Sequence, residues 1–447
     1  MSLQSALRSA AKLGRSYYLL FTAGVLADLG GFTTGTALTL HVYRLTNQNA
    51  AYLGLMAMAS LLPMLLAAPI GGVWAERRDR RLVLITCNLI RVPLVLLMMT
   101  TQRVELLLAL QTLVSVTTAL FMPSRQSLIP VLVRPEQLPL ANAFSGGVLS
   151  VVHTLGPTIG AVLYARGGGL GLAVSFEALL FLLSVGLLLG LRIPRGTNPD
   201  DRGEGYSLGK DIVNGLRYVL GEPDLRQLFT ILLVSGTAIG LLVPLLRPFT
   251  DQVLHLDDRG YAWLMTSFGI GGMLGPVVGY FVGRVLGLGL TLTLCFVLES
   301  SLFIVWTQVH SPLVSGALLV FWGIEVFALV PAYMSYVHLY ARPEYLGRTF
   351  ALFDQSMYAP GILAAGVIAL LGSKVPAQRI LLCAGLGYLT MVALTFFTAG
   401  ARLLRARSGR ERMHAEAPPP VAPGSAPGPA PEPALKVDQP PGPETAG

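Results

Sequence analysis

The chain has 447 residues, of which 53% are hydrophobic and only 13% are charged, and its net charge is +8 at pH 7. This composition excludes an ordinary soluble globular protein, in which about 25% of the residues are charged. The basic charge would suit nucleic acid, but most of the 32 Lys and Arg residues lie in short segments between long apolar runs. That distribution indicates membrane topology, so we expect no nucleic-acid partner.

Twelve apolar stretches follow one another along the chain. Each is long enough to cross a bilayer as a helix, because about 20 residues span the hydrocarbon core. They lack the alternation of apolar and polar residues that the strands of a membrane β-barrel need. The sequence therefore predicts an all-α membrane protein whose spans are residues 17–42, 50–75, 82–100, 104–124, 140–165, 169–191, 224–249, 259–283, 287–308, 313–337, 348–371 and 378–400.

The loops between these spans predict the orientation of the protein. With twelve spans both termini lie on one side of the membrane, and the loops of that side hold most of the Lys and Arg residues. The positive-inside bias then places both termini in the cytoplasm of a multi-pass protein of the cell (inner) membrane. The predicted parts are a cytoplasmic N-terminus (1–16), an N-terminal six-helix half (17–191), a cytoplasmic linker (192–223), a C-terminal six-helix half (224–400) and a disordered Pro/Ala-rich tail (401–447).

A short internal repeat supports two similar halves. The segments APIGGVWAERR and GPVVGYFVGRV belong to spans two and eight, and aligning them places Pro69 with Pro276 and Arg77 with Arg284. Both spans end in a patch of small residues followed by a base. The repeat predicts pseudo-symmetric halves, an arrangement known in transporters with the substrate site between the halves.

The loop after span two carries the clearest motif. Residues 72–81, GVWAERRDRR, resemble the G-x-x-x-D-R-x-G-R-R loop of the major facilitator superfamily, with Glu76 in place of the Asp and Asp79 in place of the second Gly. The resemblance implies a latch that closes the cytoplasmic gate on the N-terminus of span eleven, near Arg348. A carboxylate is favoured near a helix N-terminus. The predicted gate residues are Gly72, Glu76, Arg77, Asp79, Arg80 and Arg81.

Further segments resemble exporters of the same superfamily. HTLGPTIGA in span five resembles a Gly-rich motif of drug/proton antiporters, with Ala161 in place of its last Gly. Because Pro removes a backbone hydrogen bond and Gly permits close helix approach, Gly156, Pro157 and Gly160 are predicted to form a kinked pivot between the halves. FMPSRQSLIPVLVRPEQLPLANAF and RPEYLGRTFAL resemble the bacterial siderophore-exporter branch.

One feature of the resemblance is missing. Many proton-coupled drug antiporters of the superfamily carry an Arg inside span four, and none lies between Val104 and Met122. The sequence therefore gives no counterpart for the proton relay of those relatives.

Ionisable residues inside membrane spans are costly and are functional candidates by default. Asp28 in span one and Glu325 in span ten are predicted substrate or coupling carboxyls, because the resemblance places both spans around the central cavity. His153 in span five titrates near neutral pH when unperturbed, and a structural hydrogen-bonded role is the alternative. Asp354 in span eleven suits either the gate or coupling. For Asp28 the alternative is a structural ion pair with Arg91 of span three.

Two other carboxyls are expected to be structural. Glu177 and Glu299 belong to spans six and nine, which are peripheral in the superfamily fold. The cysteines have no metal-ligand spacing, and the chain has no phosphate-binding loop or zinc-protease motif. The sequence therefore predicts neither an enzyme nor a cofactor or metal site.

The predicted function is secondary active transport. We expect a monomer in the lipid bilayer that exports small hydrophobic or amphipathic compounds by alternating access, as a proton antiporter. The alternatives are a siderophore, lysolipid or metal exporter, or a transporter-like scaffold or sensor without flux. A polar anionic substrate would need a base in the cavity, and only Arg91 and Arg247 lie within the predicted spans.

Overall fold

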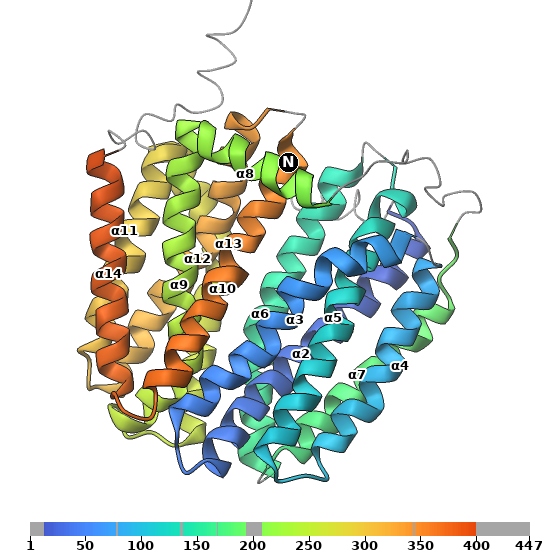
Figure 1. The fold of residues 1–447 in the computed structure, drawn as a ribbon, viewed down its shortest axis with the longest axis horizontal. Coiled ribbons are helices and arrows are strands. Elements are labelled where there is room, and N and C mark those ends of the chain that lie inside the picture. Colours follow the sequence, from blue (N-terminus) through green and yellow to red (C-terminus); the bar gives the residue numbers. More distant parts are fainter. Residues whose placement is uncertain are drawn as a thin grey trace, which may run out of the picture. The chain divides into compact units, whose positions relative to one another are not determined.

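The computed structural model describes residues 13–76, 79–134, 137–167, 169–193, 208–342 and 345–398, whose regular structure is entirely helical. They belong to one compact unit, residues 1–406. The tail predicted to be disordered, part of the predicted linker and Arg77 lie outside the described residues. Twelve helices match the twelve predicted spans, and they form two groups of six (Figure 1).

The N-terminal half consists of α2 (Arg15–Leu45), α3 (Ala50–Glu76), α4 (Arg80–Met98), α5 (Val104–Leu132), α6 (Leu138–Gly167) and α7 (Gly171–Leu189). The C-terminal half consists of α9 (Pro223–Gln252), α10 (Asp258–Leu286), α11 (Leu288–Thr307), α12 (Pro312–Tyr340), α13 (Leu346–Leu371) and α14 (Ala377–Thr398). Within the predicted linker, residues 208–221 form the additional helix α8 (Leu208–Gly221). Among the described helices, eight are individually long and apolar enough to cross a membrane.

The packing of the helices repeats between the halves. Helix α3 packs on α5 of its own half and on α13 of the other half, and α10 packs in the same way on α12 and α6. The predicted repeat between spans two and eight therefore corresponds to helices with equivalent neighbours. The helices that carry the repeat are also the ones that join the halves.

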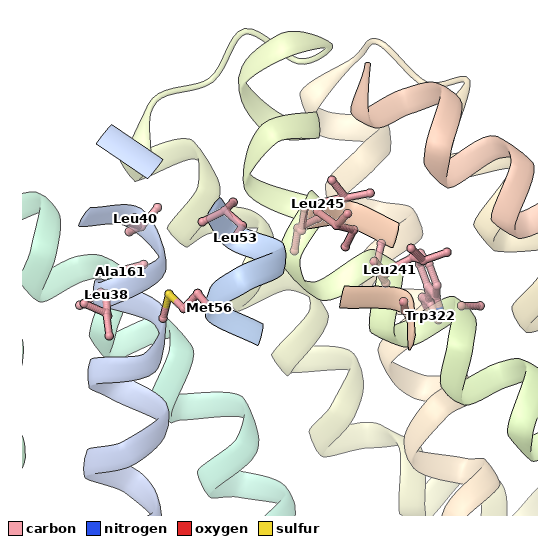
Figure 2. Packing of buried hydrophobic residues seen from close by; sticks show 14 of the residues in the cluster. Leu38, Leu40, Leu53, Met56, Ala161, Leu241, Leu245 and Trp322 are labelled. Carbon is pink, nitrogen blue, oxygen red and sulfur yellow. The ribbon is translucent and has the colours of Figure 1, made fainter. Parts of the chain in front are cut away.

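On the side where α2 ends at Leu45, here called the far side, the halves meet closely. A Cβ atom on Gly54 of α3 would lie 2.5 Å from the Ala369 nitrogen and 2.6 Å from the Ala365 oxygen of α13. Such a contact is open only to glycine. Figure 2 shows Leu53 and Met56 of α3 packed in this region, with Leu245 of α9 on one side of them. The far side is therefore closed by helix backbones in direct contact.

Helix α6, which carries the predicted pivot motif, packs on both α2 and α10, but the two glycines of the motif face the N-terminal half. A Cβ on Gly156 would meet the Phe32 side chain at 2.5 Å, and one on Gly160 would overlap the Thr33 carbonyl. Both glycines of α6 therefore face α2 inside the N-terminal half. Thr154 and Thr158 of the same helix contact the other half, since the Thr154 methyl group lies against Gly269 and the Thr158 hydroxyl lies 3.5 Å from that of Thr266 on α10. Thr154 and Gly156 are two positions apart, which corresponds to about 200° around the helix axis. The threonine and the glycine therefore project from opposite faces of α6.

Candidate functional site

A cavity in the N-terminal half contains the predicted residue Asp28. It has a volume of about 490 Å³, which lies in the range of drug-sized ligand pockets. Helices α2, α5 and α6 form its walls, which are mostly apolar and aromatic. The lining residues are Tyr17, Leu20, Phe21, Val25, Asp28, Arg125, Gln126, Ile129, Pro130, Leu138, Ser145 and Leu149.

An ion pair crosses this cavity. Nη1 of Arg125 on α5 donates to Oδ2 of Asp28 on α2 at 2.7 Å, and the two side chains are 15% and 16% exposed. Gly24, one turn before Asp28, makes room for the guanidinium group, because a Cβ there would lie 2.5 Å from Nη1 of Arg125. The Arg125 guanidinium also lies 5.9 Å from the ring centre of Phe121. The pair is therefore held in place from two helices.

The start of α2 forms an aromatic wall near the cavity. Tyr17 stacks on Phe21 with 5.8 Å between ring centres, and Phe21 lies 5.0 Å from Phe144 of α6. The Tyr17 hydroxyl donates to the Ala141 carbonyl and lies 3.0 Å from Oγ of Ser145. The cavity therefore offers aromatic surfaces and a few fixed polar groups, with a single ion pair.

Arg125 is the residue that the sequence analysis missed. The predicted span four ended at residue 124, whereas α5 continues through Pro123 and Pro130 to Leu132. Arg125 therefore lies inside the helix and not in a loop, and it supplies a base on the fourth spanning helix beyond the predicted end of the span. Its four-residue spacing from Phe121 on one helix face was the available signal.

The predicted alternative partner of Asp28, Arg91, is corrected by the same contact. Arg91 of α4 is 2% exposed, and its guanidinium donates to Thr117 and Asn88 at 3.0 Å each. The rings of Phe121 and Phe181 lie 4.8 and 5.4 Å from it. Arg91 is thus embedded in the core of the N-terminal half, while Asp28 pairs with the nearer Arg125.

The other predicted substrate or coupling residues are dispersed. His153 of α6 is exposed and lies edge-on to Phe32, with 4.4 Å between ring centres. Glu325 of α12 is buried inside the C-terminal half, with Glu299 and Cys295 of α11 as its electrostatic neighbours. The side chain of Asp354 lies outside the described part of the structure. The structure therefore does not bring Glu325 to the cavity of Asp28.

The described gate residues contact only their own half. Asp79 caps α4, and its Oδ1 accepts from the Arg81 and Leu82 nitrogens at 2.9 and 3.4 Å. The Arg81 side chain donates to the Leu188 and Leu189 carbonyls at the end of α7. Bases are favoured at a helix C-terminus. Gly72 and Glu76 belong to α3, but the Glu76 side chain is not among the described ones, so the latch stays a prediction.

Substitutions of Asp79 separate its observed role as the cap of α4 from its predicted role in the gate. We expect Asp79→Ala to lower the free energy of unfolding by about 1 kcal/mol, because the first turn of α4 loses its side-chain acceptor. Asp79→Asn keeps an acceptor and should restore thermal stability in detergent. If Asp79 also supplies the predicted gate charge, the stable Asn variant loses transport; unchanged transport would assign Asp79 to capping alone.

A second set of ionic contacts joins the halves on the far side. Arg44 at the end of α2 pairs with Asp258 at the start of α10. Asp258 also accepts from Arg247 of α9, with 3.0 Å between Nη2 and Oδ1, and Arg247 lies 3.6 Å from Asp251. The Tyr43 hydroxyl of α2 donates to Asp251 at 3.3 Å. Asp258 and Arg247 are only 3% and 5% exposed, whereas the Arg44 side chain is 54% exposed. The network therefore ties the halves through an exposed Arg on a buried ion pair.

Asp258 is expected to contribute most to this tie. Asp258→Asn should lower the free energy of unfolding by about 3 kcal/mol, because the buried Arg247 loses its nearest carboxylate. Thermal denaturation of the purified protein measures the loss. Glu105→Gln is the matched control, since Glu105 also occupies a first helical turn but is exposed. Equal stability of the two variants would contradict the assigned role.

In the described ranges, no three His, Cys, Asp or Glu residues come close enough to hold an ion. Two six-helix halves, with an amphipathic cavity in the N-terminal half, are typical of a polytopic membrane transporter. The pattern of the Major Facilitator Superfamily matches residues 20–365. The chain belongs to this superfamily, whose members are transporters and not enzymes.

Several proteins are similar to the chain over most of its length. It is 23% identical to the MFS-type transporter YkuC of Bacillus subtilis, covering 86% of this chain and 91% of that protein. It is 26% identical to macrolide efflux protein A of Enterococcus faecalis, covering 68% and 95%. It is 25% identical to the staphyloferrin A transporter of Staphylococcus aureus, covering 58% and 65%.

A solved structure confirms the fold. A bacterial homologue of the human lysosomal transporter Spinster, in an inward-facing and unoccupied conformation, superposes with a TM-score of 0.65 at 15% identity, covering 88% of this chain and 98% of that one. With the family membership, this confirms the predicted all-α, multi-pass membrane protein with two six-helix halves.

Proposed function

We propose that the chain exports small hydrophobic or amphipathic compounds in exchange for protons, with Asp28 and Arg125 in the substrate site. The observation that carries the proposal is their ion pair inside an aromatic-lined cavity of about 490 Å³. A mostly apolar wall binds an amphipathic compound without selecting a fixed shape, and a few polar groups orient it. The macrolide efflux protein among the relatives agrees with this class of substrate.

The proposed orientation gives the route that export would take. With both termini in the cytoplasm, the closed far side faces outward, and the cavity beside the start of α2 is loaded from within the cell. Opening the far side and closing the near side, by movement of one half against the other, would then release the compound outside. We propose that the protein acts as a monomer in the cell membrane.

A carboxylate-bearing compound is the second candidate substrate. Arg125 supplies the base in the cavity that an anionic substrate needs, and a guanidinium binds carboxylate groups in a two-point geometry. The relatives include a staphyloferrin A transporter. An anionic compound would displace Asp28 from Arg125, whereas an amine would displace Arg125 from Asp28.

The test measures accumulation in cells that overexpress the chain. We expect lower accumulation of a cationic macrolide than in cells carrying the empty vector, and we expect a protonophore to abolish the difference. A carboxylate siderophore measured in parallel decides between the two substrate classes. A scaffold or sensor without flux predicts no change for either compound, and that result would reject the proposal.

A further inference from the structure

A second buried polar cluster lies in the C-terminal half, apart from the cavity. Glu299 of α11 is 1% exposed and Glu325 of α12 is 5% exposed. Both Glu299 oxygens lie 3.1 Å from the Ser235 hydroxyl of α9, and the Tyr388 hydroxyl of α14 donates to one of them. Four helices of this half therefore contribute to one site.

Glu325 differs from Glu299 in receiving no hydroxyl donor among the described residues. Both of its carboxyl oxygens are buried, and the side chain beside them that can donate is the Cys295 thiol, a weak donor. Its electrostatic neighbours are the Glu299 carboxyl and the Cys295 thiol, while Glu299 faces Ser235 and Tyr388. The groups around the pair are thus neutral or acidic.

No base compensates these two carboxyls. No ion pair joins either one to Lys, Arg or His in the described part of the chain. Helix α11 contains no basic residue. The bases of the neighbouring helices lie at helix ends, namely Arg226 of α9, Arg259 and Arg284 of α10, His338 of α12 and Arg379 of α14, and Arg247 of α9 is paired with Asp258 and Asp251. The N-terminal half is arranged differently, because its cavity carboxyl Asp28 is paired with Arg125.

Burial without a base favours a bound proton. An isolated ionised carboxylate in an apolar interior costs far more free energy than a neutral carboxylic acid, so a group in such a site takes up a proton. Glu299 receives two hydroxyl donors, which stabilise a charged carboxylate. Glu325 receives none, so the proton belongs on Glu325.

We propose that Glu325, positioned beside Glu299, is a proton-binding site that is separate from the substrate site of Asp28 and Arg125. The inference rests on the proposed proton-coupled transport and names the group that carries the proton. One proton binds one carboxylate oxygen of Glu325 from water on one side of the membrane and is released to water on the other side. Because both carboxyls are sealed here, release requires a rearrangement of α11 and α12.

Infrared spectroscopy of the purified chain in lipid tests the site without any transport. The expected result is a C=O stretch of a protonated carboxylic acid at neutral pH that disappears in Glu325→Gln and remains in Asp28→Asn. Glu299→Gln should shift this band, because the neighbouring charge is removed. A band of unchanged intensity in Glu325→Gln, or its absence from the unmodified chain, would overturn the proposal.

Size-exclusion chromatography shows whether Glu325→Gln folds. If it does not fold, a second variant tests the proposal. Tyr388→Phe removes one donor to Glu299 and should shift the same band, and an unmoved band would overturn the proposal. In proteoliposomes, Glu325→Gln should bind substrate but lose accumulation driven by a pH gradient, whereas Asp28→Asn should lose both. A chain that moves no compound but keeps the Glu325 band would reject the proposed function and retain the proton site.

Discussion

Arg125→Gln is expected to abolish transport and to lower the free energy of unfolding by about 2–3 kcal/mol. The substitution leaves Asp28 charged and without a partner in a mostly apolar cavity, and removing one member of a buried ion pair is costly for this reason. This loss is smaller than the value of about 3–5 kcal/mol that is usual for a fully buried ion pair, because the two side chains are 15% and 16% exposed. Thermal denaturation and drug accumulation measure the two effects.

The double variant Asp28→Asn/Arg125→Gln separates pairing from function. It contains no unpaired charge, so its stability should recover most of what Arg125→Gln loses, and the double-mutant cycle gives the coupling energy. Transport should not recover, because the groups that orient the substrate are gone. Arg166→Gln, at an exposed position of α6, is the control. A double variant that transports normally would show that the pair is only structural.

Gly54→Val is expected to stop transport by keeping the far side open. Its side chain would start 2.5–2.6 Å from backbone atoms of Ala369 and Ala365, whereas carbon atoms need about 3.5–4.0 Å. Backbone atoms of a helix cannot turn aside as a side-chain end can. The halves must therefore separate at α3 and α13, and the conformation in which the far side is open gains population.

Thiol labelling measures this separation. Leu53 is 2% exposed. In a chain without the native cysteines, the thiol of Leu53→Cys should therefore react slowly with a membrane-impermeant reagent. Adding Gly54→Val should speed the reaction markedly. Gly366→Val is the matched control on α13, because a Cβ at Gly366 meets nothing within 4 Å. Equal labelling rates in the two variants would show that the contact at Gly54 does not hold the far side closed.

The sequence predicted the fold well because membrane spans obey a simple length rule. Each of the twelve predicted spans corresponds to a helix, and most ends agree within a few residues. The exception is the end of span four, where the polar segment SRQS between Pro123 and Pro130 resembles a loop. Helix α5 nevertheless continues, because neighbouring helices in a membrane protein compensate for backbone groups that a Pro leaves unpaired.

The candidate site was only partly predictable, because a sequence gives the span of a residue but not the direction of its side chain. Asp28 was selected as a costly intramembrane charge, and the structure places it in a cavity. Glu325 was selected by the same rule, yet it faces α11. Gly156 and Gly160 face α2 because the rotation of α6 is set by all of its neighbours together. Helix rotation is a property of packing, which no single span encodes.

The ionic tie on the far side has an electrical consequence for the transport cycle. Arg44 belongs to the N-terminal half, while Arg247, Asp251 and Asp258 belong to the C-terminal half. When the halves separate on the far side, the N-terminal half keeps a positive charge at its edge and the C-terminal half keeps a net negative charge. These charges attract each other across the gap and favour closing it again. Salt screens this attraction once the two edges are separated by about 8–10 Å. The ionic strength of the compartment on that side should therefore set how quickly the carrier reseals, and with it the turnover of the whole cycle.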